Sequence, residues 1–99
     1  MIQHIVLLKL KPDATTEQKA ALLDGLIALE DKIPGIESVS GGDDNSPEGK
    51  GHGFDWAFVM TFTDAEARDA YRPHPDHQAL GQDLLRPIVD DVLDLDYEI

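Results

Sequence analysis

The segment from Phe54 to Phe62 constrains the fold more than any other part of the chain, because its large apolar residues recur at every second position. One face carries Phe54, Trp56, Phe58, Met60 and Phe62, and the intervening positions are smaller or polar. Such alternation is typical of a β-strand. The segment is therefore predicted to be a strand whose aromatic residues all point to the same side of a sheet.

Residues 2–10, with the sequence IQHIVLLKL, form a second predicted strand, and both of its faces are largely apolar. His4 and Val6 share one face, while Ile5 and Leu7 lie on the other. A strand in an exposed antiparallel sheet has one polar face, so a strand with two apolar faces is covered twice. We expect helices on one side of this strand and a second subunit on the other.

A helix is predicted between these strands. Thr15 followed by Gln18 matches a capping box, and apolar residues then recur at helical spacing until Pro34 and Gly35 end the helix; the apolar set is Leu22, Leu23, Leu26, Ile27 and Ile33. Residues 36–40 are expected to form a short strand that ends at the glycine pair 41–42.

The C-terminal half repeats this arrangement. Thr63 and Glu66 match a second capping box, whose helix breaks at Pro73. Pro75 suits the first position of a further helix with His74 as its cap, and this helix continues as far as the proline at position 87. The alternating residues 92–99 are predicted to form the last strand.

The element order is therefore βαββα(α)β in a single domain spanning residues 1–99. This order predicts an α+β, ferredoxin-like fold: a four-stranded antiparallel sheet with helices on one face. The other face would be a large apolar patch unless two copies pack sheet against sheet, so we expect a homodimer that forms an α+β barrel. In such a barrel the aromatic stripe is expected to form the dimer core and, near the rim, an apolar wall. Residues 43–53 lack periodicity and are expected to form a loop.

The charge balance argues against several classes of partner. Lys and Arg number 8 and Asp and Glu number 20, which gives a net charge of −12. Nucleic acid and anionic membranes would be repelled, so neither is expected as a partner, and the acidic surface is expected to serve solubility. The apolar N-terminal segment is too short to span a bilayer and lacks signal-peptide features, so a cytoplasmic location is expected.

The sequence contains none of the common cofactor motifs. It has no cysteine, which excludes disulfides, iron–sulfur clusters and a cysteine nucleophile. Phosphate-binding, dinucleotide-binding and zinc motifs are also missing, so no cofactor is expected.

Several segments together resemble the stress-responsive α/β-barrel family, called Dabb. They are IQHIVLLKLK at residues 2–11, KIPGI at 32–36, NSPEG at 45–49, GFDWAFVMTF at 53–62, YRPHPDHQAL at 71–80 and the Asp–Tyr pair at 96–97. The resemblance covers nearly the whole chain and implies a dimeric barrel of ferredoxin-like type. The periodicity predicts this fold independently.

The resemblance also implies a reaction. A plant polyketide cyclase of this family uses a tyrosine and a histidine for an intramolecular aldol condensation, and Tyr71 and His77 stand at the matching places. The chain departs from the cyclase at Leu23 and Leu26, where the cyclase has aromatic residues, and at Trp56, where it has a histidine. These departures imply a different substrate pocket.

The residues themselves give Tyr71 and His77 a chemical role. His77 lies in the first turn after Pro75, where the positive end of the helix dipole disfavours an imidazolium. A neutral imidazole is a competent general base, and the Tyr71 hydroxyl could hold a carbonyl oxygen while His77 removes a proton from the adjacent carbon. We expect these two catalytic residues in a cleft that binds a small carbonyl or polyketide-like compound; the expected ligand-binding residues are His4, His74, Trp56 and Phe58.

Three alternatives remain open from the sequence. His74 could simply cap a helix while His77 bonds a backbone carbonyl and Tyr71 fills a gap between helices. His74, Asp76 and His77, with His52, could hold a metal ion, although no recognised motif supports this and no metal is predicted. The protein could also be a non-enzymatic stress protein that acts as a stable oligomer or protein partner.

Overall fold

The computed structural model describes residues 1–99. The elements are β1 (Ile2–Leu10), α1 (Thr16–Lys32), β2 (Ile36–Asp43), β3 (Trp56–Phe62), α2 (Ala65–Tyr71), α3 (Pro75–Leu80) and β4 (Val89–Glu98). A π-helical turn over Gly81–Leu85 and a 3-10 turn over Arg86–Ile88 connect α3 to β4. The predicted α+β order is confirmed.

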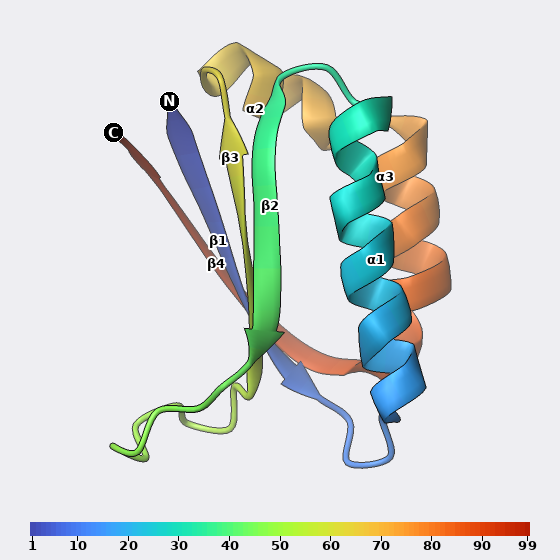
Figure 1. The fold of residues 1–99 in the computed structure, drawn as a ribbon, viewed down its shortest axis with the longest axis vertical. Coiled ribbons are helices and arrows are strands. Elements are labelled where there is room, and N and C mark those ends of the chain that lie inside the picture. Colours follow the sequence, from blue (N-terminus) through green and yellow to red (C-terminus); the bar gives the residue numbers. More distant parts are fainter.

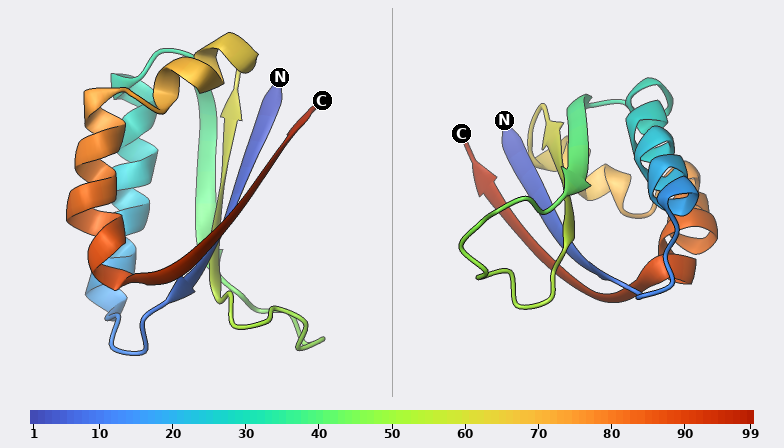
Figure 2. Two further views of the ribbon diagram at one scale, coloured as in Figure 1. Left: turned by 180° about the vertical axis from the view of Figure 1, so that it is seen from behind. Right: turned by 60° about the horizontal axis from the view of Figure 1, so that its bottom comes forward.

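The four strands form one antiparallel sheet in the order β2-β3-β1-β4. Helices α1 and α3 lie side by side on one face, and no element covers the other face (Figure 1). The view from behind shows the same two layers, with α2 at one end of the sheet and the segment between β2 and β3 projecting at the opposite end, on the uncovered side (Figure 2). None of the helices is long and apolar enough to cross a membrane.

The hydrophobic core lies between α1 and the helix-facing side of the sheet. Leu22, Leu26 and Leu29 recur at helical spacing and are almost fully buried, as are Met60 and Phe62 on β3. Burying a side chain of this size contributes about 1.5–3 kcal/mol to the free energy of unfolding. This core fixes the positions of β1 and β3, which form the centre of the sheet.

One predicted core position of α1 is wrong. Ile27 is 43% exposed, because the buried stripe continues through Leu29 and Ile33 and leaves Ile27 on the outer flank. Glu30, outside the apolar set of α1, accepts a hydrogen bond from the Val39 amide at 2.8 Å. That contact lies just after the register shift between β2 and β3, so Glu30 satisfies an edge-strand donor that has no partner strand.

The capping box at Thr15 and Gln18 is confirmed, since each side chain accepts the other residue's amide. The second predicted box, at Thr63 and Glu66, is wrong. The N-cap of α2 is Asp64, whose carboxylate accepts the Ala67 amide at 2.8 Å.

Three strand boundaries also differ from the prediction. β2 does not end at the glycine pair but continues to Asp43, and a Cβ at Gly41 would lie 2.8 Å from the Ala57 carbonyl oxygen. Glycine is thus required by the close pairing of β2 with β3, and it does not mark a turn here. β3 begins at Trp56, two residues later than expected, and β4 begins at Val89, three residues earlier.

The predicted place of the aromatic stripe in the dimer core is wrong. Trp56, Phe58, Met60 and Phe62 are all 5% exposed or less, because they face the helices of their own subunit. The alternation was interpreted correctly as a strand, but period two does not show which of the two faces meets the helices.

The uncovered face of the sheet is apolar near β4. Leu7 on β1 lies opposite Leu93 on β4, and the next pairs on this face are Ile5 with Leu95 and Gln3 with Tyr97. Leu93, Leu95 and Tyr97 are 50%, 64% and 49% exposed. Exposed apolar patches of this kind are typical of interaction surfaces.

Candidate functional site

A hollow of about 570 Å³ lies on the helix-facing side of β4, next to α2 and the start of α3. Its lining is mostly polar and comprises His4, Arg68, Asp69, Tyr71, Arg72, His77, Asp94, Leu95 and Asp96. The sheet register explains why β1 and β4 contribute together, because His4 lies directly opposite Asp96. Both side chains therefore project to the same face, toward α2.

Tyr71 forms the apolar floor of this hollow. The residue is 3% exposed, and its ring lies 5.2 Å from the ring of Phe62 and 4.1 Å from that of His77, centroid to centroid. Its hydroxyl makes no hydrogen bond within the protein, yet no fully buried side-chain oxygen lacks a partner. The hydroxyl therefore belongs to the small exposed part of the residue, and its hydrogen-bonding capacity is not used within the protein.

Burial also sets the acidity of this tyrosine. Desolvation raises the pKa of Tyr71 above its ordinary value of 10.0, because the surrounding protein disfavours a phenolate. The hydroxyl thus stays protonated throughout the neutral range and acts as a hydrogen-bond donor. Such a donor suits a carbonyl or enolate oxygen.

His77 is oriented by the end of α2. Its Nδ1 lies 2.9 Å from the carbonyl oxygen of Arg72, and that oxygen also accepts a hydrogen bond from Gln78. A carbonyl oxygen only accepts hydrogen bonds, so Nδ1 carries the proton. In the neutral ring, Nε2 is then the unprotonated nitrogen and is able to accept a proton from a ligand.

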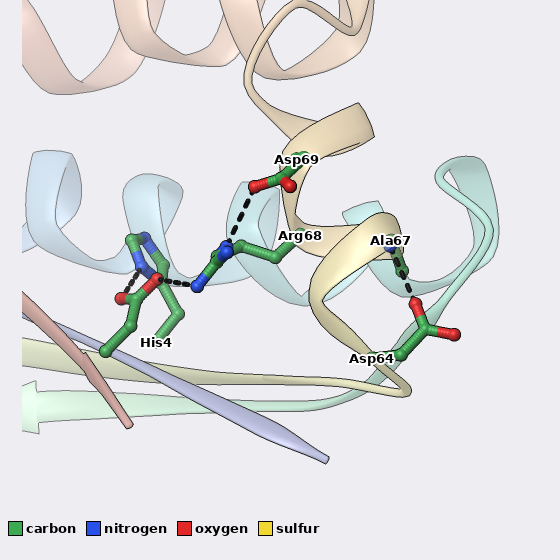
Figure 3. Close-up of polar contacts among 6 residues, drawn as sticks. His4, Asp64, Ala67, Arg68 and Asp69 are labelled. Atoms are coloured by element: carbon green, nitrogen blue, oxygen red, sulfur yellow. Dashed lines mark hydrogen bonds and ion pairs between the residues drawn. The ribbon is translucent and has the colours of Figure 1, made fainter. Parts of the chain in front are cut away.

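His4 is oriented by a carboxylate. Its Nδ1 donates to Asp96 at 2.7 Å, and the other oxygen of Asp96 lies 3.4 Å from Arg68, which also contacts Asp69 at 3.1 Å. Figure 3 shows His4, Arg68 and Asp69 in this chain of contacts. The hydrogen bond from Arg68 to Asp69 is the main cause that raises the pKa of Arg68, so this guanidinium is permanently charged.

The other predicted ligand-binding residues do not line this hollow. His74 caps α3, as predicted, because its Nδ1 accepts the Asp76 amide at 3.1 Å. Phe58 is buried, and its ring packs against His4 with the two ring centroids 6.2 Å apart. Trp56 lies at the far end of β3 and borders a different hollow, of about 560 Å³, beneath residues 42–54 on the uncovered face.

Sequence reasoning missed Arg68, Asp69, Arg72 and Asp94 as site residues. Their types and spacing resemble those of an ordinary exposed helix and strand. The register of β1 with β4 places Asp94, whereas the position of α2 at the end of the sheet places Arg68, Asp69 and Arg72. The Asp–Tyr pair at 96–97 was one signal, because it is among the segments that resemble the Dabb family. The structure brings together no group of three or more His, Cys, Asp or Glu side chains that could hold a metal ion.

Comparison with known families decides the affiliation of the chain, because the sequence pattern of the stress responsive A/B barrel domain, Dabb, matches residues 2–99. The chain belongs to the Dabb family. The resemblance found in the sequence is therefore confirmed over nearly its whole length.

Relatives of this Dabb chain include one enzyme and one protein described as dimeric. Olivetolic acid cyclase of Cannabis sativa is 29% identical over 96 residues, which cover 97% of this chain and 94% of the cyclase. The crystal structure of At3g17210 from Arabidopsis thaliana matches with a TM-score of 0.92 at 27% identity, covering 100% of this chain and 95% of that one. A dimeric ferredoxin-like protein of unknown function from Jannaschia sp. CCS1 matches with a TM-score of 0.84 at 28% identity, covering 99% and 98%.

Proposed function

We propose that this Dabb protein binds a small organic carbonyl compound in the Tyr71–His77 hollow and transfers a proton without a cofactor. The observation that carries the proposal is the pairing of a free, protonated Tyr71 hydroxyl with a His77 ring whose Nδ1 is already occupied. The similarity to olivetolic acid cyclase supports a cyclase or lyase type of reaction.

The chemistry would divide between the two residues. The Tyr71 hydroxyl donates a hydrogen bond to the carbonyl oxygen, which stabilises the negative charge that develops there. His77 Nε2 accepts the proton from the carbon next to that carbonyl, and its Nδ1–H remains bonded to the Arg72 carbonyl. The resulting enolate would attack a second carbonyl of the same molecule in an aldol cyclisation, and His77 would return the proton afterwards.

We also propose that two copies associate through the uncovered sheet face as a homodimer. The exposed Leu93, Leu95 and Tyr97 support this arrangement, and the dimeric relative from Jannaschia has the same fold. Two-fold pairing would place the same patch of each copy against the other.

A purely structural role is the second candidate, and specific contacts favour it. His74 caps α3, and His77 forms a hydrogen bond with the Arg72 carbonyl. Both histidines therefore stabilise the turn between α2 and α3. On this alternative the protein would serve as a stable dimer in a stress response. The two candidates differ in what His77 Nε2 does.

A ligand screen separates the candidates. Small ketones, aldehydes and aromatic carbonyl compounds would be tested by thermal shift on the wild-type protein, on His77→Gln and on Tyr71→Phe, because a ligand raises the melting temperature only of a protein that binds it. The proposal predicts a compound that stabilises the wild type and stabilises both variants less. His52→Gln, in the loop far from the hollow, serves as a matched control and should respond like the wild type. If every compound that binds shifts all four proteins equally, the catalytic proposal is wrong and the structural role is favoured.

A further inference from the structure

The charges that surround the proposed site do not balance. Two arginines, Arg68 and Arg72, line the hollow against three carboxylates, Asp69, Asp94 and Asp96. With neutral histidines, the formal charge of the lining is 2 − 3 = −1. The site therefore lies in a locally negative environment.

Neither arginine compensates for this charge. Arg68 is already shared between Asp69 and Asp96 at 3.1 and 3.4 Å, so an anionic ligand would have to compete with two carboxylates for it. Arg72 is exposed and takes part in no ion pair, and its single positive charge faces the carboxylate of Asp94, which is equally exposed and unpaired.

The rest of the molecule strengthens the same field. The chain carries a net charge of −12, and a second copy in a dimer would carry the same charge. Summed charge of one sign repels anions from an open hollow and lowers their local concentration. The donor at the floor, by contrast, is the uncharged Tyr71 hydroxyl, which needs no charge on its acceptor.

We propose that the Tyr71–His77 hollow selects uncharged carbonyl compounds over carboxylates and phosphate-bearing carriers, and that Asp94 at its mouth is a specificity-determining residue. This inference rests on the proposed function, because it specifies the substrate class for that same site. The discrimination comes from repulsion of the anion and not from an added contact with the uncharged compound.

A matched pair of probes tests the inference. Methyl 4-acetylbenzoate and 4-acetylbenzoate share one aromatic ketone; the ester is uncharged and carries one additional methyl group, and the acid is an anion. The effect of the methyl group does not depend on salt or on Asp94, so the salt series and the variants below isolate the effect of the charge. The dissociation constants of the two probes would be measured by NMR titration of the wild type. We expect the ester to bind about fivefold more tightly, the effect of one water-screened contact charge. The ratio should shrink when salt is raised from about 0.01 M to about 1 M, because the screening length falls from about 30 Å to about 3 Å.

Two variants locate the effect. Asp94→Asn removes a charge at the mouth, and Asp24→Asn removes one from the exposed side of α1, so both change the net charge of the protein by the same amount. Asp94→Asn should reduce the ratio of the carboxylate's dissociation constant to that of the ester about twofold or more. Asp24→Asn should leave this ratio near the wild-type value.

The outcomes are distinct from failure of the proposed function. If neither probe binds, the carbonyl-binding proposal fails and the selectivity inference fails with it. If both probes bind but the carboxylate binds as tightly as the ester, or both variants narrow the ratio equally, carbonyl binding stands and the selectivity assigned to Asp94 is overturned.

Discussion

Tyr71 is a residue of the site whose acidity is set by burial. Its ring is buried between Phe62 and His77, and burial raises the pKa of its hydroxyl above 10.0. The Tyr71 hydroxyl therefore ionises at a lower pH in the unfolded chain than in the folded protein. Below pH 10 the Tyr71 hydroxyl is neutral in both the folded and the unfolded protein, so its burial has no ionisation cost there.

This residue predicts a pH dependence of stability. As the pH rises above 10.0, the unfolded state loses the Tyr71 proton first, so the free energy of unfolding falls by up to about 1.4 kcal/mol per pH unit until the folded state also ionises. Tyr71→Phe cannot ionise and should not show this contribution. Urea unfolding at about pH 8 and about pH 11 should therefore show a smaller loss of stability in Tyr71→Phe than in the wild type. Equal losses in the two proteins would contradict the assigned desolvation of Tyr71.

His4 shows what sequence reasoning could and could not predict for a single residue. That His4 shares a face of β1 with Val6 follows from period two, although period two does not show which face meets the helices. A half-buried imidazole also requires a nearby polar partner. The identity of that partner, Asp96, depends on a register between strands at opposite ends of the chain. Local pattern contains no information about such a register, and for that reason Asp94 was not found.

At the scale of elements, α2 positions Arg68 and Tyr71, and its start is fixed by Asp64. The Asp64 carboxylate accepts the Ala67 amide, and its charge also suits the positive end of a helix. Thr63 matched the capping pattern equally well in the sequence, but its hydroxyl makes no such bond. The choice between adjacent capping residues depends on where β3 ends, and β3 ends at Phe62, two residues before the cap.

This assignment predicts different costs for two neighbouring substitutions. Asp64→Ala should lower the free energy of unfolding by about 1 kcal/mol, the usual value for loss of an N-cap. Thr63→Ala should change it by less than about 0.5 kcal/mol, as for most exposed positions. Chemical denaturation of both variants would measure the difference. A larger cost for Thr63→Ala than for Asp64→Ala would restore the capping box expected from the sequence.

At the scale of the whole molecule, the order of strands leaves β4 exposed on both faces. Most of the fold was predictable, since periods of two and 3.6 give the element order and hence one sheet with helices on one face. The face of β3 on which the aromatic stripe lies could not be predicted as helix-facing or uncovered, because either face of the strand could have met the helices. The burial of Trp56 and Phe58 shows that the subunit core takes the aromatic residues and leaves aliphatic residues and Tyr97 for the uncovered face.

The proposed homodimer leads to a prediction about that face. Leu95 is 64% exposed and lies opposite Ile5, midway along the β1–β4 pair on the uncovered face, so Leu95→Lys would place a charge in the proposed interface. This variant should sediment as a monomer and retain the far-ultraviolet circular dichroism of the wild type. Ile27→Lys is a matched control, because Ile27 is 43% exposed on the outer flank of α1. If Leu95→Lys and the wild type have the same mass in solution, the dimer does not form through this face.

The central claim is that His77 presents an unprotonated Nε2 to a carbonyl ligand held by Tyr71, and histidine NMR tests it most directly. The chain has 4 histidines, so the ring nitrogens can be assigned by substituting each in turn. At a pH where the ring is neutral, we predict that His77 Nδ1 is protonated and Nε2 is not, because Nδ1 donates to the Arg72 carbonyl. Addition of a bound aromatic ketone should then shift the Nε2 resonance of His77 more than that of His52. A proton on Nε2 in the free protein, or a His77 resonance that a bound ketone leaves unchanged, would contradict the account.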